Sequence, residues 1–227
     1  MVALRESQAR PSSTGERGPA AAAPGARAAL LVVALLLGGC STPGGGYAPR
    51  NGDIIFQTST SAQSVAIQKA TRSPYSHMGI VYLSDGQAFV FEAVEPVRST
   101  PLDRWIARGQ GGHFAVKRLR DADSVLTPRA LRRMLEVGRA FEGRHYDPYF
   151  EWSDDRIYCS ELVWKVYKRA LGVELGRLQH MREFDLTDPL VRAKVRERWG
   201  AAPPAGETVI SPAAIFGSRR LVTAYTR

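Results

Sequence analysis

Residues 154–171 read DDRIYCSELVWKVYKRAL, and this stretch decides how the chain is interpreted. Apolar residues recur in it at helical spacing from Ile157 to Leu171, and Gly172 is a typical helix stop. Asp154 or Asp155 is expected to cap the amino end of this helix. Cys159 would then lie in the first turns, where unpaired backbone N–H groups stabilise a thiolate and can also stabilise an oxyanion.

Helix spacing alone leaves a second interpretation of Cys159 open. The cysteine shares one face of the predicted helix with the apolar residues Leu162, Val163, Val166 and Ala170. It could therefore be an inert core residue, because free cysteines are often buried. A base on a neighbouring element would favour the catalytic interpretation.

The candidate base is His77, which begins a predicted strand at 77–82. A turn at 84–86 connects this strand to a return strand at 88–94 that carries Glu92 among apolar residues. Positions 77 and 92 are expected to lie roughly opposite each other, within reach across the hairpin. Glu92 would then orient and stabilise the imidazolium. The alternatives are a structural His77 and a Glu92 that faces solvent.

The remaining segments predict one folded domain over residues 51–227. Turn and periodicity signals place further strands at 53–57 and 112–119 and helices at 61–70, 128–142 and 188–199, followed by short apolar pieces. The order β-α-β-β-β-α-α predicts an α+β domain in which helices pack against an antiparallel sheet. The substrate pocket is expected among the loops at 109–112, 145–153 and 173–210.

The amino-terminal segment has the pattern of a targeting signal. Residues 28–37 read AALLVVALLL, which is the length of a signal-peptide core and shorter than the roughly 20 residues of a membrane span. Leu37-Gly38-Gly39-Cys40 follows and resembles the lipobox of bacterial lipoproteins. We expect residues 1–39 to be a lipoprotein signal peptide, Cys40 to be lipidated and 40–50 to be a flexible tether. A plain signal peptide or a short anchor helix is the alternative.

This interpretation places the protein in the cell envelope, attached to a membrane by its lipid. Ser41 after the cysteine resembles an outer-membrane sorting signal, which in a diderm host would direct the protein to the periplasmic face of that membrane. The formal net charge of +9 comes mainly from scattered arginines. It indicates a solvated cationic surface or attraction to an anionic lipid or cell-wall polymer. No nucleic-acid partner, metal ion or cofactor is expected.

Five short motifs, taken in order, resemble those of the permuted papain-like amidases of the YaeF/YiiX type, within the NlpC-type cysteine hydrolases. They are GDIIF (52–56), SHMGIV (76–81), FEA (91–93), YD (146–147) and YCSELV (158–163). The resemblance implies a circularly permuted papain-like fold in which the histidine precedes the cysteine. It also implies that Cys159 is the nucleophile, His77 the base and Glu92 the third member, and that 173–210 is a variable insertion.

The expected reaction is attack of the Cys159 thiolate on an acyl carbonyl, which forms a thioester acyl-enzyme that water then hydrolyses. Hydrolysis of an amide, in a peptidoglycan peptide or a lipid-linked amide, is the leading hypothesis. One alternative is acyl transfer or lipid-ester cleavage, as in the related lecithin:retinol acyltransferase-like fold. The other is a non-catalytic lipoprotein that binds an envelope component.

Overall fold

A computed structural model describes residues 46–227 of the chain. The predicted signal peptide, the lipidation site Cys40 and the first part of the tether lie outside the described residues. Within 46–227, none of the helices combines the length and the apolar character that crossing a bilayer requires.

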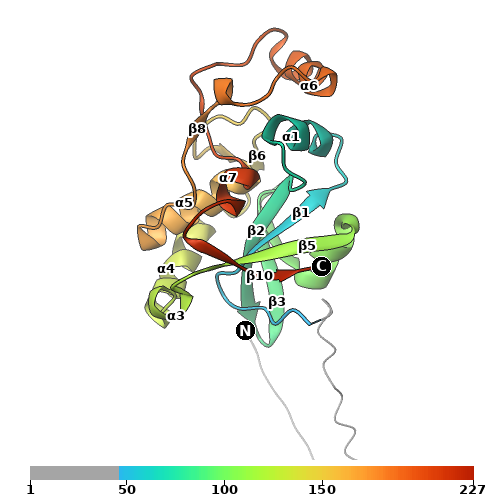
Figure 1. Cartoon of the computed structure of the whole chain (residues 1–227). Coiled ribbons are helices and arrows are strands. Elements are labelled where there is room, and N and C mark those ends of the chain that lie inside the picture. The colour runs from blue at the N-terminus through green and yellow to red at the C-terminus, as the bar shows by residue number, and fades with distance from the viewer. Residues whose placement is uncertain (1–45) are drawn as a thin grey trace, which may run out of the picture. The chain divides into compact units, whose positions relative to one another are not determined.

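The centre of the domain is a six-stranded sheet in which every neighbouring pair is antiparallel (Figure 1). Its strand order is β10-β5-β1-β2-β3-β4. The strands are β1 (Ile54–Ser59), β2 (His77–Ser84), β3 (Gln87–Glu92), β4 (Arg98–Pro101), β5 (Gly109–Leu119) and β10 (Leu221–Thr226). The predicted hairpin of β2 and β3 is present, and it lies beside the first strand of the domain.

Seven α-helices occur in the described part of the chain: α1 (Ser64–Thr71), α2 (Leu102–Arg108), α3 (Ala122–Val125), α4 (Pro128–Arg139), α5 (Cys159–Leu171), α6 (Pro189–Trp199) and α7 (Pro212–Phe216). The remaining elements of the described residues are short: β6 (His145–Tyr146), β7 (Arg156–Ile157), β8 (Gln179–His180), the 3-10 helix η1 (Met181–Glu183) and β9 (Thr208–Val209). The predicted insertion 173–210 thus contains β8, η1, α6 and β9.

Alternation along the strands gives the sheet two apolar faces. Phe56 and Met78 belong to the core that includes Leu162 of α5, whereas Ile55 and Val81 belong to the core that includes Trp105 of α2. The sheet is consequently covered by α4 and α5 on one face and by α2 on the other. The predicted α+β class, with helices packed on an antiparallel sheet, is confirmed.

Several predicted boundaries differ from the structure. The helix of the opening stretch begins at Cys159, and its cap is Tyr158 rather than Asp154 or Asp155. The reason is that 156–157 forms the short strand β7, which keeps the backbone extended up to the cap. Asp154 instead binds basic side chains further along α5. Strand β4, helix α2 and the edge strand β10 were not predicted as elements.

Candidate active site

The described residues contain a single free cysteine, Cys159, at the first position of α5. Only 3 % of its surface is exposed. The backbone N–H groups of the first helical turn have no partner within the helix, so they can stabilise negative charge beside the thiol. The cysteine thus lies at the positive end of a helix, as predicted, although the cap is a different residue.

His77 is placed between Cys159 and Glu92. It begins β2, is 8 % exposed, and holds its Nε2 atom 2.5 Å from Oε2 of Glu92. Burial by itself would lower the pKa of His77, but hydrogen bonds to the Cys159 side chain and to Glu92 outweigh burial and raise it to about 9. These contacts favour the charged form of the imidazole, and Nδ1 is the ring nitrogen left to exchange a proton with the thiol.

Glu92, at the end of β3, has no exposed surface and is surrounded by hydrogen-bond donors. Besides His77 it accepts hydrogen bonds from Thr100 Oγ1 (2.6 Å), the indole Nε1 of Trp105 (2.9 Å) and Arg108 (2.5 Å). Burial would raise the pKa of Glu92, but the hydrogen bond and charge of His77, together with the bonds from Thr100 and Arg108, lower it to about 2. Glu92 thus carries its charge in the folded protein.

The sequence placed His77 roughly opposite Glu92, and the strand register refines this expectation. Ile80 pairs with Phe91, which brings Gly79 opposite Glu92 and leaves His77 two residues away along the strand. Both side chains lie on the same face of the sheet, and a diagonal contact over this distance is within reach of long side chains. The structure therefore brings together all three residues that the sequence singled out: Cys159, His77 and Glu92.

Tyr146 of β6 is a fourth polar group near the thiol, and the sequence motif that contains it gave no role. Burial raises its pKa, and so does the nearby negative charge of Cys159, which keeps the phenol protonated. Its hydroxyl accepts a hydrogen bond from Gln63 Nε2 at 3.3 Å and can still donate its own proton. Near the thiol, the protonated phenol and the N–H groups at the start of α5 are candidate donors to an oxyanion.

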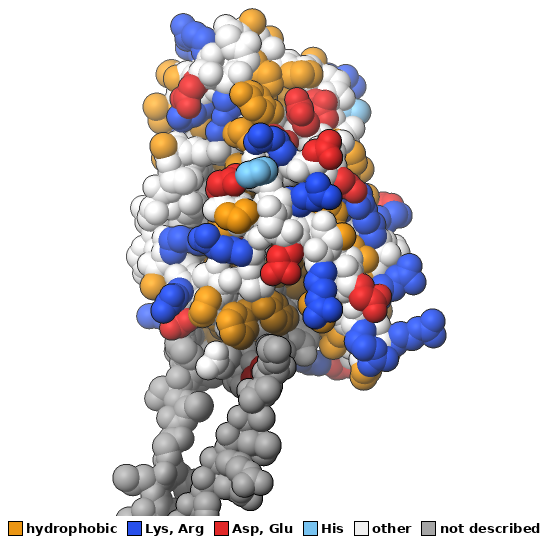
Figure 2. Space-filling view, turned by 180° about the vertical axis from the view of Figure 1, so that it is seen from behind, with side chains coloured by type: hydrophobic (Ala, Val, Ile, Leu, Met, Phe, Trp, Pro, Cys, Tyr) orange, Lys and Arg blue, Asp and Glu red, His pale blue; other side chains and the backbone are white. Residues whose placement is uncertain are grey.

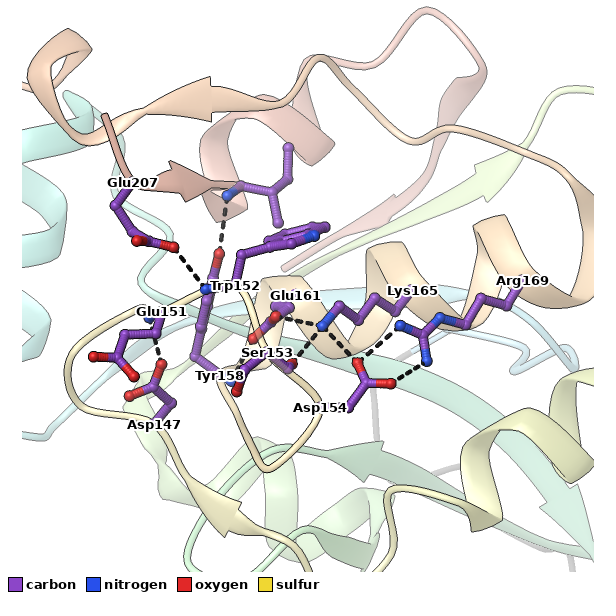
Figure 3. A network of polar contacts seen from close by, with 11 residues as sticks. Asp147, Glu151, Trp152, Ser153, Asp154, Tyr158, Glu161, Lys165, Arg169 and Glu207 are labelled. Atoms are coloured by element: carbon purple, nitrogen blue, oxygen red, sulfur yellow. Dashed lines mark hydrogen bonds and ion pairs between the residues drawn. The ribbon is translucent and has the colours of Figure 1, made fainter. Parts of the chain in front are cut away.

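An ionic network, buried at Glu161 and Lys165 and exposed at Asp154 and Arg169, holds the start of the helix that carries the thiol (Figure 3). Lys165, 3 % exposed, contacts Glu161 Oε1 at 2.7 Å and Asp154 Oδ1 at 2.8 Å, and it also donates to the carbonyl of Ser153. Arg169 binds both oxygens of Asp154, at 2.7 and 2.8 Å. These contacts tie the loop before Cys159 to the body of α5.

The carboxylate of Glu161 completes this network at the start of the helix. It accepts a hydrogen bond from the backbone N–H of Tyr158, the residue immediately before the nucleophile, at 3.4 Å. Burial raises the pKa of Glu161 to about 8 even though Lys165 opposes this. No sequence signal distinguishes Glu161 and Lys165 from an ordinary exposed i, i+4 pair, so their burial could not be predicted.

An apolar cavity of about 100 Å³ opens beside the thiol. Tyr158, Cys159 and Ser160 form one wall, and residues of α1, of 181–199 and of 209–212 form the others. Of the three loops expected to line a pocket, 173–210 supplies the largest share of the lining, 145–153 supplies Phe150, and 109–112 does not reach the cavity. The contribution of α1 was not expected.

The surface charges indicate less about function than the buried site does. On the face seen in Figure 2, basic and acidic side chains are interspersed and no large field of one sign forms. Among residues 46–227, no group of three or more His, Cys, Asp or Glu side chains is arranged to hold a metal ion.

Comparisons with known proteins give consistent results. A family described as permuted papain-like amidase enzyme, YaeF/YiiX, C92 family, matches residues 48–225. The uncharacterized protein YiiX of Escherichia coli K12 is 46% identical over 194 residues, which cover 86% of this chain and 93% of that protein.

A solved structure, titled as the metalloprotein yiiX from Escherichia coli O157:H7, has 46% sequence identity and a TM-score of 0.76. The alignment covers 80% of this chain and 99% of that one. Together with the order of His77 before Cys159, these matches confirm the predicted permuted papain-like fold.

Proposed function

The chain belongs to the permuted papain-like amidase family of YaeF and YiiX, and from this premise we propose that it cleaves an amide bond through a thioester acyl-enzyme on Cys159. The observation that carries the proposal is the position of His77. Its buried ring hydrogen-bonds to the Cys159 side chain on one side and to Glu92 on the other. A nucleophile, a base and a group that orients the base are the parts that such a reaction needs.

In the first half of the reaction the thiolate attacks the acyl carbonyl. The C–S bond forms, and the oxyanion is stabilised by the N–H groups at the start of α5 and by the hydroxyl of Tyr146. The protonated His77 then gives its proton to the leaving amine, and the C–N bond breaks. Glu92 keeps the imidazole oriented and stabilises its charged form throughout.

In the second half, water replaces the amine. The neutral His77 takes a proton from the water, whose oxygen attacks the thioester carbonyl. The C–S bond breaks, the acid is released, and the thiolate–imidazolium pair forms again. The residues of this chain suffice for each proton transfer.

The proposal is tested by the rate at which iodoacetamide alkylates Cys159 at pH 6.5. We expect fast labelling in the wild type and a loss of at least about 10²-fold in His77→Ala, the lower range for a lost general base. His145→Ala is the matched control, because His145 also contacts a glutamate, Glu95, at 2.7 Å but is exposed on the surface. Slow labelling that is equal in all three proteins would contradict catalysis and favour a binding protein.

We also propose that the mature protein is anchored in the cell envelope by lipid on Cys40, at the periplasmic face of the outer membrane in a diderm host. The support is the order of apolar run, small residues and cysteine at 28–40. Mass spectrometry of the mature amino-terminal peptide should find an acylated Cys40. An unmodified amino terminus at another position would refute the anchor. Membrane association of Cys40→Ala equal to that of the wild type would also refute it.

A further inference from the structure

The central sheet has two ends, and the active-site residues of its strands lie at one of them. Because β2 and β3 are antiparallel, His77 at the start of β2 and Glu92 at the end of β3 lie at the same end. Strand β1 begins at the other end, where Asn51 accepts a hydrogen bond from the N–H of Leu83 at 2.7 Å. The chain thus enters the domain away from the active site, at what we call the entry end. In Figure 1 the blue start of the described chain lies low in the view, whereas α1 and α6 lie at its top.

Unpaired arginines gather at the entry end. Five are exposed and make no ion pair with any described residue: Arg120 after β5, Arg219 before β10, and Arg129, Arg132 and Arg133 in the first two turns of α4. Of the exposed acidic residues there, Asp121 and Asp123 are each bound by an arginine. Asp85 and Glu136 remain against the five arginines, so the entry end carries an excess of positive charge.

A groove of about 490 Å³ between α4 and β2 brings exposed apolar side chains next to this charge. Its lining includes Asn51 and Arg132, which places the start of α4 at the entry end. Leu83 and Leu135, which are 43 % and 47 % exposed, line it as well, and Glu142 is its one acidic side chain. Arginines beside exposed leucines suit a bilayer surface, because the guanidinium groups attract anionic headgroups while the apolar side chains enter the interface.

Charge alone does not decide which end faces a bilayer. The active-site end also has exposed arginines without an ion pair among the described residues, namely Arg182, Arg192 and Arg196. Its other basic groups are paired, as in Lys69 with Asp188 and Arg72 with Asp185. The choice between the two ends therefore depends on where the chain enters.

The point of entry is fixed by Tyr47. Its ring is 3 % exposed and packs against Phe114 and Tyr225, and its hydroxyl donates to Asp53 at 2.7 Å. Cys40 lies seven residues earlier, and seven residues span at most about 25 Å. Strand β2 alone, with eight residues, is about 26 Å long, and α1 and α6 lie beyond its active-site end. A lipid on Cys40 would therefore hold the entry end closer to the bilayer than α1 and α6.

Resting on the proposed lipid on Cys40, we propose that the entry end binds the anionic bilayer that holds this lipid, through its unpaired arginines and Leu83. The active site then opens away from that bilayer, at about the length of β2 from its surface. The substrate of Cys159 accordingly reaches the site from the aqueous side, and a lipid-linked amide of the same bilayer lies out of reach.

The experiment adds a tryptophan at the entry end of the mature lipidated protein with Leu83→Trp. The protein is reconstituted in vesicles with dibrominated lipid, which quenches tryptophans at the bilayer, made of phosphatidylcholine alone or mixed with anionic phosphatidylglycerol. We expect quenching of the added fluorescence in the anionic vesicles and its recovery in about 1 M salt, where the Debye length is about 3 Å. The native tryptophans, among them Trp199 at the end of α6, should stay unquenched. Quenching of the native tryptophans instead would overturn the proposal.

Two matched triple variants of the Leu83→Trp protein locate the charge. Glutamine at 129, 132 and 133 removes three arginines from the entry end. Each arginine near an anionic surface contributes about fivefold, so the ratio of docked to undocked protein should fall about 10²-fold. Glutamine at 182, 192 and 196 removes the same charge from the active-site end and should leave the ratio unchanged. Equal quenching in the two triple variants, or in neutral and anionic vesicles, would overturn the proposal.

The result can be separated from the other two proposals on the same preparation. Mass spectrometry shows whether Cys40 carries lipid, and iodoacetamide shows whether Cys159 is reactive. If both hold and the added tryptophan is not quenched, only the docking proposal fails. If Cys40 carries no lipid, the docking proposal fails together with the anchor, whereas the hydrolase proposal stands.

Discussion

Replacement of Glu92 by glutamine should move the titration of His77 to lower pH. The wild-type pKa of His77 is raised from 6.5 to about 9, which corresponds to a preference of about 3 kcal/mol for the imidazolium. The influences that raise it are the hydrogen bond and the charge of Cys159 and the hydrogen bond and the charge of Glu92. With the Glu92 charge removed and burial unchanged, the midpoint should fall by about 1 to 2 pH units.

The measurement is an NMR titration of the histidine ring protons between pH 5 and 10. The chain has four histidines, so the His77 signal is assigned by its absence in His77→Ala. Glu95→Gln serves as the control, because it removes a carboxylate from the exposed His145 and should leave the His77 midpoint where it was. A wild-type midpoint near 6.5, or the same midpoint in Glu92→Gln, would refute the assignment of Glu92 as the stabilising partner.

Three further outcomes follow from the site. Tyr146→Phe removes one proposed oxyanion donor and should lower kcat by about 10²-fold or more with little change in KM, measured on an N-acyl-p-nitroanilide that the wild type cleaves. Lys165→Met leaves Glu161, whose pKa burial already raises to about 8, without its partner and should cost about 1 to 3 kcal/mol in urea unfolding, whereas adding Glu161→Leu should recover most of this loss. The stability contributed by Glu92 is present above pH 4.5 and is lost as pH falls towards 2, and that of His77 is present below pH 6.5 and is lost as pH rises through 9. The melting temperature should therefore be highest between about pH 4.5 and 6.5. A melting temperature that keeps rising to pH 9 would contradict this.

The parts of the fold that the sequence predicted have strong local signals. The β2–β3 hairpin has runs of apolar residues on both sides of an Asp-Gly turn, and α5 has a sustained helical period that ends at Gly172. Because both catalytic candidates of the sheet lie on this one hairpin, the relation between His77 and Glu92 could be predicted from local spacing. The approach of Cys159 to His77 could only be expected from the family resemblance and the need for a base.

The parts that the sequence did not predict depend on short elements and distant packing. Strand β4 has four residues and α2 has seven, which is too few for a periodic pattern to emerge. These two elements supply Thr100, Trp105 and Arg108, so the donors around Glu92 could not be foreseen. The cavity beside Cys159 depends on α1 packing against α6, a contact between distant parts of the chain that no local pattern indicates.

Gly79 illustrates how a residue without a side chain contributes to the site. A Cβ atom there would lie 2.4 Å from Cγ1 of Val90, 2.7 Å from the carbonyl oxygen of Phe91 and 3.3 Å from Cβ of Glu92. Strands β2 and β3 can therefore keep this separation only with glycine at position 79. Because the position opposite Glu92 is empty, its carboxylate can lie diagonally against His77 instead of being held apart by an intervening side chain. Gly79 of the SHMGIV motif is thus explained by the hydrogen bond that it permits between His77 and Glu92. The raised pKa of His77 depends in part on that bond.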